Sequence, residues 1–237
     1  MKTHDGHVVI VTGAPGNLGS AVSKAYLKAG ANLVLVDYKE DRLKERFPEL
    51  ASTEDHYLAA SVDLTQPEAV QNMVHETMDR FNRIDAVVNT VGGFTMGEKV
   101  HEMDLETLEK MMSLNARTFL ITSKAVVPHM IKAGKGKIVS IGARPSLEGK
   151  AKMGAYSVAK SAVLRLTEAM SSELKGQGIN VNCVLPGTID TPPNRKAMPD
   201  ADHSKWVQPA SLADVILFLT SDAARDIHGA AIPVYGS

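Results

Sequence analysis

Tyr156 and Lys160 are two side chains whose types and spacing point directly to chemistry. They stand four residues apart, in a segment whose apolar residues recur at helical spacing. Residues i and i+4 lie on one face of a helix, so the phenol and the ammonium group point into the same space. A tyrosine ordinarily loses its proton near pH ~10, and a neighbouring cation lowers that value. The pair therefore predicts a proton donor and acceptor for general acid–base catalysis near neutral pH.

A glycine-rich turn at residues 12–19 indicates where a dinucleotide would bind. It follows a β-branched apolar run at residues 8–12 and precedes a helical pattern, and a second apolar run at 33–36 ends at Asp37. Strand, glycine turn, helix, strand and carboxylate in this order are the context that a dinucleotide site requires. The glycines let the backbone approach a pyrophosphate, which rests on the helix N-terminus.

The carboxylate of Asp37 also predicts a cofactor preference. A carboxylate at the end of the second strand bonds the ribose hydroxyls and repels a 2′-phosphate, so the sequence favours NAD(H). Tyr38 and Lys39 follow it directly and leave NADP(H) possible.

The whole chain alternates between strand-like and helical patterns. Strands are expected at residues 8–12, 33–36, 57–62, 84–89, 137–141, 179–185 and 230–234. Helices are expected after the glycine turn, at 67–81, at 105–130 with lost regularity near Pro128, around Tyr156, and at 212–219. This alternation predicts an α/β fold, a doubly wound parallel sheet of the Rossmann type, in a single domain over residues 1–237. The irregular stretch 188–208 follows a strand, where ligands bind in such sheets, so it is expected to be a substrate loop or lid.

Composition excludes several classes of function. The formal net charge is −1 over 237 residues, with Lys and Arg spread along the chain, so no nucleic-acid partner is expected. No apolar stretch is long enough for a signal peptide or a membrane span, which predicts no membrane association and a cytoplasmic protein. Cys183 is the only cysteine, which excludes an internal disulfide and fits a reducing compartment. No metal site is expected.

Over nearly its whole length the chain resembles the short-chain dehydrogenase/reductase family. The matching pieces occur in the family's order: the 12–19 turn, Asp63-Leu64, Asn89 before Gly92, Asn115, Tyr156 with Lys160, and Pro186-Gly187 followed by Thr191. The resemblance implies an NAD(P)H-dependent oxidoreductase that transfers a hydride to a C=O or C=N group of a small-molecule substrate. It also implies a homodimer or homotetramer, in which the apolar residues Leu114, Phe119, Leu164 and Leu166 serve either the subunit contacts or the core.

The resemblance assigns roles residue by residue. Tyr156 would be the catalytic acid/base, Lys160 would bind the nicotinamide ribose and tune the tyrosine, and Asn115 would support a proton relay through water. Ile189 and Thr191 would hold the nicotinamide carboxamide. The full set of implied cofactor contacts is Gly13, Gly16, Asn17, Leu18, Gly19, Asp37, Asp63, Leu64, Asn89, Val91, Gly92, Tyr156, Lys160, Pro186, Gly187, Ile189 and Thr191.

Two positions depart from the family's usual pattern. Asn17 stands where the middle glycine of the turn usually lies, and the glycine is Gly16 instead. Ala143 stands thirteen residues before Tyr156, where the family normally has its catalytic serine. A methyl group cannot hydrogen-bond a substrate oxygen, so either Ser140 or Ser146 replaces the missing hydroxyl, or nothing does.

Both departures, together with Gly92-Gly93-Phe94, resemble dihydropteridine reductases, whose substrate is a quinonoid pterin. The expected substrate residues are Phe94, Ala143 and Arg144. Phe94 either stacks on a planar ring or covers the core below the cofactor. A second possibility is a dinucleotide-sensing protein with weak or no turnover, which Ala143 favours and the intact Tyr156, Lys160 and Asn115 oppose.

Overall fold

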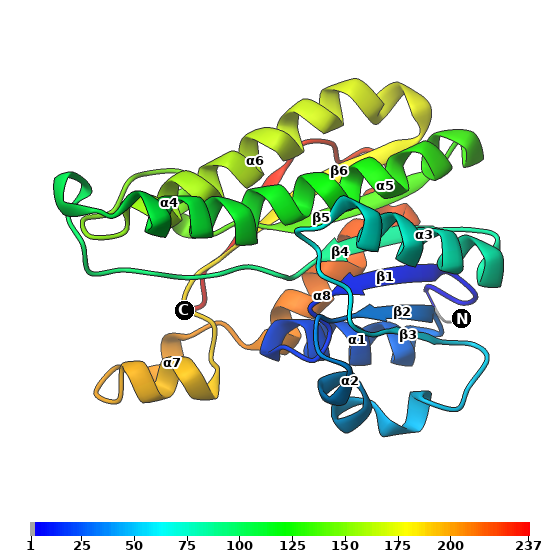
Figure 1. Ribbon diagram of the computed structural model, residues 1–237, viewed down its shortest axis with the longest axis horizontal. Helices are drawn as coiled ribbons and strands as arrows, with labels where there is room; N and C mark the ends of the chain where they lie inside the picture. Colours follow the sequence, from blue (N-terminus) through cyan, green and yellow to red (C-terminus); the bar gives the residue numbers. More distant parts are fainter. Residues whose placement is uncertain (1–2) are drawn as a thin grey trace.

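A computed structural model describes residues 3–237, and its centre is one seven-stranded sheet (Figure 1). Neighbouring strands all pair in parallel, in the order β3-β2-β1-β4-β5-β6-β7. The strands are β1 Val8–Thr12, β2 Asn32–Val36, β3 Tyr57–Ala59, β4 Ala86–Asn89, β5 Gly136–Ile141, β6 Ile179–Pro186 and β7 Ala231–Val234. Every residue of β1, β4 and β6 is buried, because helices cover both faces of a parallel sheet.

The helices form two layers, one on each face of the sheet. They are α1 Asn17–Ala29, α2 Glu40–Arg46, α3 Pro67–Phe81, α4 Leu105–Met112, α5 Thr118–Ala133, α6 Gly154–Leu174, α7 Pro192–Ala197 and α8 Pro209–Thr220. Helices α3, α5 and α6 pack on one face, and α1, α2 and α8 lie on the other (Figure 1). Alternate β1 residues serve the two cores, Val8 and Ile10 in one and Val9 and Val11 in the other. The predicted doubly wound α/β fold is confirmed.

The sheet reverses its winding at β1, which lies between β2 and β4. At such a point the loops that follow neighbouring strands diverge to opposite faces and leave a crevice at the carboxyl ends of the strands. Helices α4 and α7 both lie beyond this end of the sheet, at the left of Figure 1. The loops after β1, β4, β5 and β6 therefore bring many of the residues that the sequence singles out to this end of the sheet.

Several predicted bounds differ from those of the structure, most by one to three residues. The third strand ends at Ala59 rather than at residue 62, because Ser61 adopts a positive φ of 57° and turns the chain away from the sheet edge. The predicted helix at 105–130 is interrupted by a π-helical segment, Ser113–Arg117, and not near Pro128, which lies inside α5. The irregular stretch 188–208 contains the short helix α7 and a 3-10 turn, His203–Lys205.

Two of the four apolar residues that were expected to serve either subunit contacts or the core are buried in the core. Phe119 and Leu164 are fully buried within the chain itself, at 2% and 0% exposure, so they serve the core. Leu114 and Leu166 are half-buried and also pack against core clusters. Within residues 3–237, none of the helices combines the length and the apolar character that crossing a bilayer requires.

Candidate active site

Tyr156 and Lys160 both project from the first turns of α6, as their spacing predicts. Lys160 is buried, and its ammonium group donates a 2.8 Å hydrogen bond to the carbonyl oxygen of Ile141, the last residue of β5. Its nitrogen lies 6.0 Å from the centre of the Tyr156 ring. The pair is therefore assembled by one helix and one strand end, with the lysine charge below the tyrosine ring.

Burial shifts the pKa values of both Lys160 and Tyr156. It lowers the pKa of the Lys160 ammonium to about 8, and it raises the pKa of the Tyr156 phenol to about 12. The sequence predicts that Lys160 lowers the tyrosine pKa, but in this structure the pKa is raised because the phenol is buried. Tyr156 is therefore a protonated phenol at neutral pH, which suits a proton donor.

Asn115 lies in the π-helical segment that interrupts α4 and α5, a type of irregularity frequent at functional sites. Its side chain forms a reciprocal pair with the backbone of Gly93: Nδ2 donates to the carbonyl at 3.2 Å and Oδ1 accepts from the amide at 3.2 Å. Nδ2 also donates to Met111 O at 2.9 Å. The amide group thus holds the loop after β4 through Gly93 and bonds the preceding helical turn through Met111.

Gly92 lies between Asn115 and Lys160 with no room for a side chain. A Cβ added there would lie 2.7 Å from Asn115 Oδ1 and 3.1 Å from Lys160 Nζ. The loop after β4, the π-helical segment and α6 therefore converge within a few ångströms. The resemblance assigned Asn115, Lys160 and Gly92 to one site; it did not predict the pairing of Asn115 with Gly93.

The position of the family's serine is occupied by the methyl group of Ala143, which is 6% exposed. The hydroxyl of Ser140 is bonded to Thr167 Oγ1 at 2.8 Å and is fully buried under α6, so it does not replace the missing serine. Ser146 folds back, and its Oγ accepts a 3.0 Å hydrogen bond from the Ala143 amide. That hydroxyl holds the turn after β5.

The ring of Phe94 meets the ring of Tyr156 edge to face, with 4.9 Å between ring centres and an interplanar angle of 79°. Phe94 is 59% exposed, so it does not cover the core, and its free surface remains available to a ligand. Arg144, the third expected substrate residue, is exposed and lies 5.3 Å from the centre of the Tyr235 ring, a cation–π contact.

The glycine turn after β1 has the shape of a cradle for an anion. A Cβ on Gly19 would lie 2.2 Å from Gly13 O, and one on Gly13 would lie 2.8 Å from Val91 Cγ2. Helix α1 begins after Gly16, and no side chain caps its first N–H groups. Asn17 is exposed and Leu18 half-buried at this end. Free amides at a helix N-terminus fit the pyrophosphate of a dinucleotide.

Two polar groups farther along the strand ends also fit a dinucleotide. The buried Asn89 has a side-chain nitrogen, Nδ2, with no hydrogen-bond partner among the described residues. Such a group is costly to bury alone, so it indicates a ligand contact. Asp63 is half-buried and accepts hydrogen bonds from the amide and hydroxyl of Thr65, and Leu64 beside it is buried.

Asp37 lies at the end of β2 with its carboxylate 6% exposed. It accepts a 2.8 Å hydrogen bond from the Lys39 amide and lies 3.3 Å from Arg42 Nη1, on α2. Arg42 is a site residue that sequence reasoning missed. In the sequence, Arg42 could have been noticed only as a basic side chain five residues after Asp37. The short helix that carries it was not predicted.

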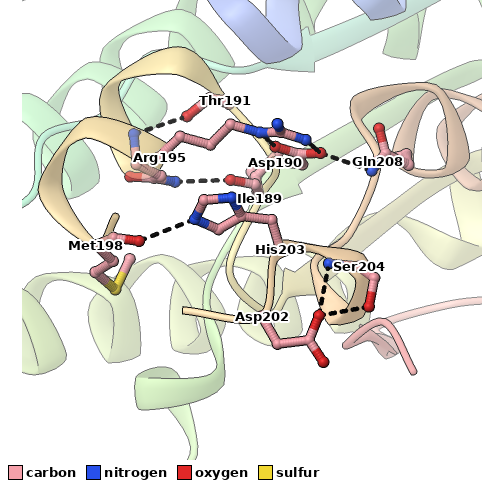
Figure 2. A network of polar contacts seen from close by, with 10 residues as sticks. Ile189, Asp190, Thr191, Arg195, Met198, Asp202, His203, Ser204 and Gln208 are labelled. Carbon is pink, nitrogen blue, oxygen red and sulfur yellow. Dashed lines mark hydrogen bonds and ion pairs between the residues drawn. The ribbon is translucent and has the colours of Figure 1, made fainter. Parts of the chain in front are cut away.

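The end of β6 carries the residues expected to contact nicotinamide. Pro186 is buried, and a Cβ on Gly187 would lie 2.6 Å from Tyr235 O. Asn194 of α7 then holds the next two: its Nδ2 donates to Ile189 O at 2.8 Å, and its amide donates to Thr191 Oγ1 at 3.4 Å (Figure 2). Helix α7 thus fixes this stretch, a role for Asn194 that the sequence did not indicate.

Comparison with known proteins assigns the family. Residues 7–202 match the family described as short chain dehydrogenase. The chain is 31% identical to 2-(R)-hydroxypropyl-CoM dehydrogenase of Xanthobacter autotrophicus, covering 97% of each chain. It is also 31% identical to a (2S)-[(R)-hydroxy(phenyl)methyl]succinyl-CoA dehydrogenase subunit of Thauera aromatica, over 97% of this chain and 95% of that one.

A solved structure agrees with the sequence comparison. The crystal structure of gox2181 superimposes with a TM-score of 0.90 at 28% identity, covering 98% of this chain and 95% of that one. The family match, the relatives and the shared fold lead to one conclusion. This chain belongs to the short-chain dehydrogenase/reductase family and is an NAD(P)-dependent oxidoreductase.

Proposed function

We propose that the protein reduces a C=O or C=N group of a small, planar, conjugated substrate, with Tyr156 as the proton donor and NADH as the preferred reductant. The observation that carries the proposal is Phe94, which is 59% exposed and whose ring meets the ring of Tyr156 edge to face; the alanine at position 143 supports it. An aromatic wall next to the proton donor suits a flat substrate. An alanine there suits one that needs no serine hydroxyl on its oxygen.

The residues at the carboxyl ends of the strands support an assignment of the cofactor contacts. The turn from Gly13 to Gly19 would hold the pyrophosphate, Asp37 the adenine ribose, and Ile189 with Thr191 the nicotinamide carboxamide. Bound NADH would supply the hydride. The buried carboxylate of Asp37 opposes a 2′-phosphate, and its partner Arg42 moderates that opposition.

Residues of the chain itself would carry out the proton transfer. Tyr156 is protonated at neutral pH and donates its proton to the heteroatom of the substrate. The Lys160 cation then stabilises the resulting phenolate, which takes a new proton from solvent. Asn115 fixes Gly92 and Gly93 close to the lysine, and positioning and charge stabilisation supply most of the acceleration.

Quinonoid dihydropterin is the second candidate, as one specific member of this substrate class. Phe94 offers it a ring to stack on, and Ala143 stands at the serine position. We also propose a homo-oligomer in the cytoplasm. The exposed Leu105, Leu120 and Val158, on α4, α5 and α6, support a subunit contact, and the unpaired Cys183 fits a reducing compartment.

The test is NADH oxidation, followed by absorbance with NADPH in parallel. Quinonoid dihydropterin is offered beside flat quinones, conjugated ketones and saturated ketones, and Tyr156→Phe is assayed alongside the wild type. The proposal expects turnover of flat substrates and a loss of about 10²- to 10⁴-fold in Tyr156→Phe. Preference for saturated ketones, or near-wild-type turnover by Tyr156→Phe, would contradict it.

A further inference from the structure

The segment after β6 contains a polar network with a part that has not been given a role above (Figure 2). Its centre is Asp190, whose side chain is 9% exposed. The carboxylate accepts two hydrogen bonds from Arg195, at 2.5 Å from Nε and 2.7 Å from Nη2. It accepts a third, at 2.9 Å, from Gln208 Nε2. Bidentate pairs of this kind are strong and fix both distance and orientation.

Asp190 joins the two ends of the 188–208 segment. Arg195 belongs to α7, and Gln208 directly precedes α8. The backbone makes the same connection, because the Asp190 amide donates to Val207 O at 2.8 Å and the Val207 amide donates to Thr188 O at 2.9 Å. One carboxylate therefore ties the start of the segment to its middle and to its end.

The chain neighbours of Asp190 are Ile189 and Thr191, the two residues expected to contact nicotinamide. Asn194 binds both of them, and Arg195, the next residue of α7, binds Asp190. The first turn of α7 thus grips three consecutive residues at once. Loss of the Asp190 contacts would leave the orientation of Ile189 and Thr191 to weaker bonds.

We propose that Asp190, paired with Arg195, is a positioning residue that holds Ile189 and Thr191 ready to receive the nicotinamide. This inference rests on the proposed cofactor site. If breaking the pair leaves only a fraction of molecules with the segment correctly ordered, the apparent dissociation constant rises by the inverse of that fraction. The hydrogen bonds from Arg195 also hold the pKa of Asp190 well below its ordinary value, so the pair persists throughout the neutral range.

Tryptophan fluorescence can report on this segment. Trp206 is the single tryptophan, and it lies in the segment with its ring 4.3 Å from the ring of His203. Trp206 emission and its energy transfer to bound NADH therefore measure binding without any substrate. The variants are Asp190→Asn, Arg195→Gln, the double variant and Arg195→Lys. The matched control is Asp202→Asn, in the same segment, where the carboxylate accepts hydrogen bonds from Ser204 and pairs with Lys205.

We expect each single variant to weaken NADH binding about tenfold, by the fraction argument above. The double variant should be no weaker than the singles, because partners in one interaction are not additive. Arg195→Lys, which keeps the charge, should recover part of the affinity, and Asp202→Asn should bind as the wild type does. Melting temperatures close to that of the wild type would separate this role from a general loss of stability.

Each contrary result has a distinct meaning. Wild-type affinity in Asp190→Asn, or additive losses in the double variant, would overturn the positioning role while leaving the cofactor site intact. Should Asp190→Asn fail to fold, Arg195→Gln breaks the same pair through a side chain that is 55% exposed, and its affinity for NADH decides the question. A wild-type protein that binds neither NADH nor NADPH would instead refute the proposed function itself, and this inference with it.

Discussion

The carbonyl oxygen of Ile141 accepts a 2.8 Å hydrogen bond from the Lys160 ammonium group. The last residue of β5 therefore holds this charge close to Tyr156. The strand end and helix α6 therefore share the task of positioning the cation. Because the pKa of Lys160 is lowered to about 8, from 10.5, the group is fully charged only below that pH.

The first prediction follows from this titration. Reductive kcat/KM should fall as pH rises through about 8, because Lys160 then loses the charge that stabilises the Tyr156 phenolate. Lys160→Met should be slower by about 10²-fold or more and should lack this limb. The measurement is a pH profile of both proteins at saturating NADH. If kcat/KM of Lys160→Met still fell as pH rises through about 8, the fall would have to come from the titration of another group.

The second prediction concerns the serine position. Ala143→Ser should raise turnover of simple ketones about tenfold, because a hydroxyl there can hydrogen-bond the carbonyl oxygen as charge develops. Turnover of a flat pterin or quinone should stay within about twofold, since orientation comes from Phe94. Rates with both substrates are compared in the same preparation, with Ser146→Ala as the control. Equal gains on both substrates would mean that flat substrates also need the hydroxyl.

The third prediction concerns Phe94. Phe94→Ala should raise KM for a flat substrate about five- to tenfold and change kcat little, because an aromatic pair contributes binding at this edge of the site. The neighbouring Met96 is equally exposed, at 59%, so Met96→Ala is a matched control that should leave KM near the wild-type value. A fall in kcat with unchanged KM would instead mean that Phe94 orients Tyr156.

The fourth prediction concerns the choice of cofactor. Asp37→Ser should raise kcat/KM for NADPH relative to NADH by about tenfold or more, because it removes a repelling charge and frees Arg42 for the phosphate. Adding Arg42→Gln should cancel much of that gain. Kinetics with both cofactors provide the measurement. If the ratio does not move in Asp37→Ser, the carboxylate does not set the preference.

The fifth prediction concerns stability. His4 is 1% exposed, its Nε2 lies 3.1 Å from Thr220 Oγ1, and burial lowers its pKa below 6.5. The unfolded chain therefore binds the proton first as pH falls. The free energy of unfolding should drop below about pH 6.5, by up to about 1.4 kcal/mol per pH unit, until the folded form also titrates.

Urea unfolding at neutral and mildly acidic pH checks this. His4→Gln should lose part of the acid sensitivity. The control is His75→Gln, at an exposed histidine of α3 with a 75% exposed side chain, which should keep it. Equal acid sensitivity in all three proteins would exclude His4 as the titrating group.

The sequence was sufficient where local pattern and buried surface agree. The β-branched runs of β1 and β6 and the glycine turn before α1 identified the strands, the parallel sheet and the cofactor end of the fold. The four-residue spacing of Tyr156 and Lys160 placed both on α6. Each of these depends on residues close together in the chain.

The remaining features depend on contacts between distant segments. The low proton affinity of Lys160 arises from burial, which no spacing reveals. At the interruption between α4 and α5, the amide of Asn115 bonds the backbone of Gly93, 22 residues earlier in the chain. Arg42 and Asn194 lie on short helices whose placement against Asp37 and Ile189 is decided by the packing of the whole chain.

The packing of α1 against α8 has a consequence for biosynthesis. The Tyr26 hydroxyl lies 2.6 Å from Thr220 Oγ1, although the two residues are 194 positions apart. At about 5–20 residues per second, the ribosome makes the second partner roughly 10 to 40 seconds after the first. Throughout that interval the surface of α1 that packs against α8 lacks its partner, so we expect this surface to be open to chaperones that bind growing chains.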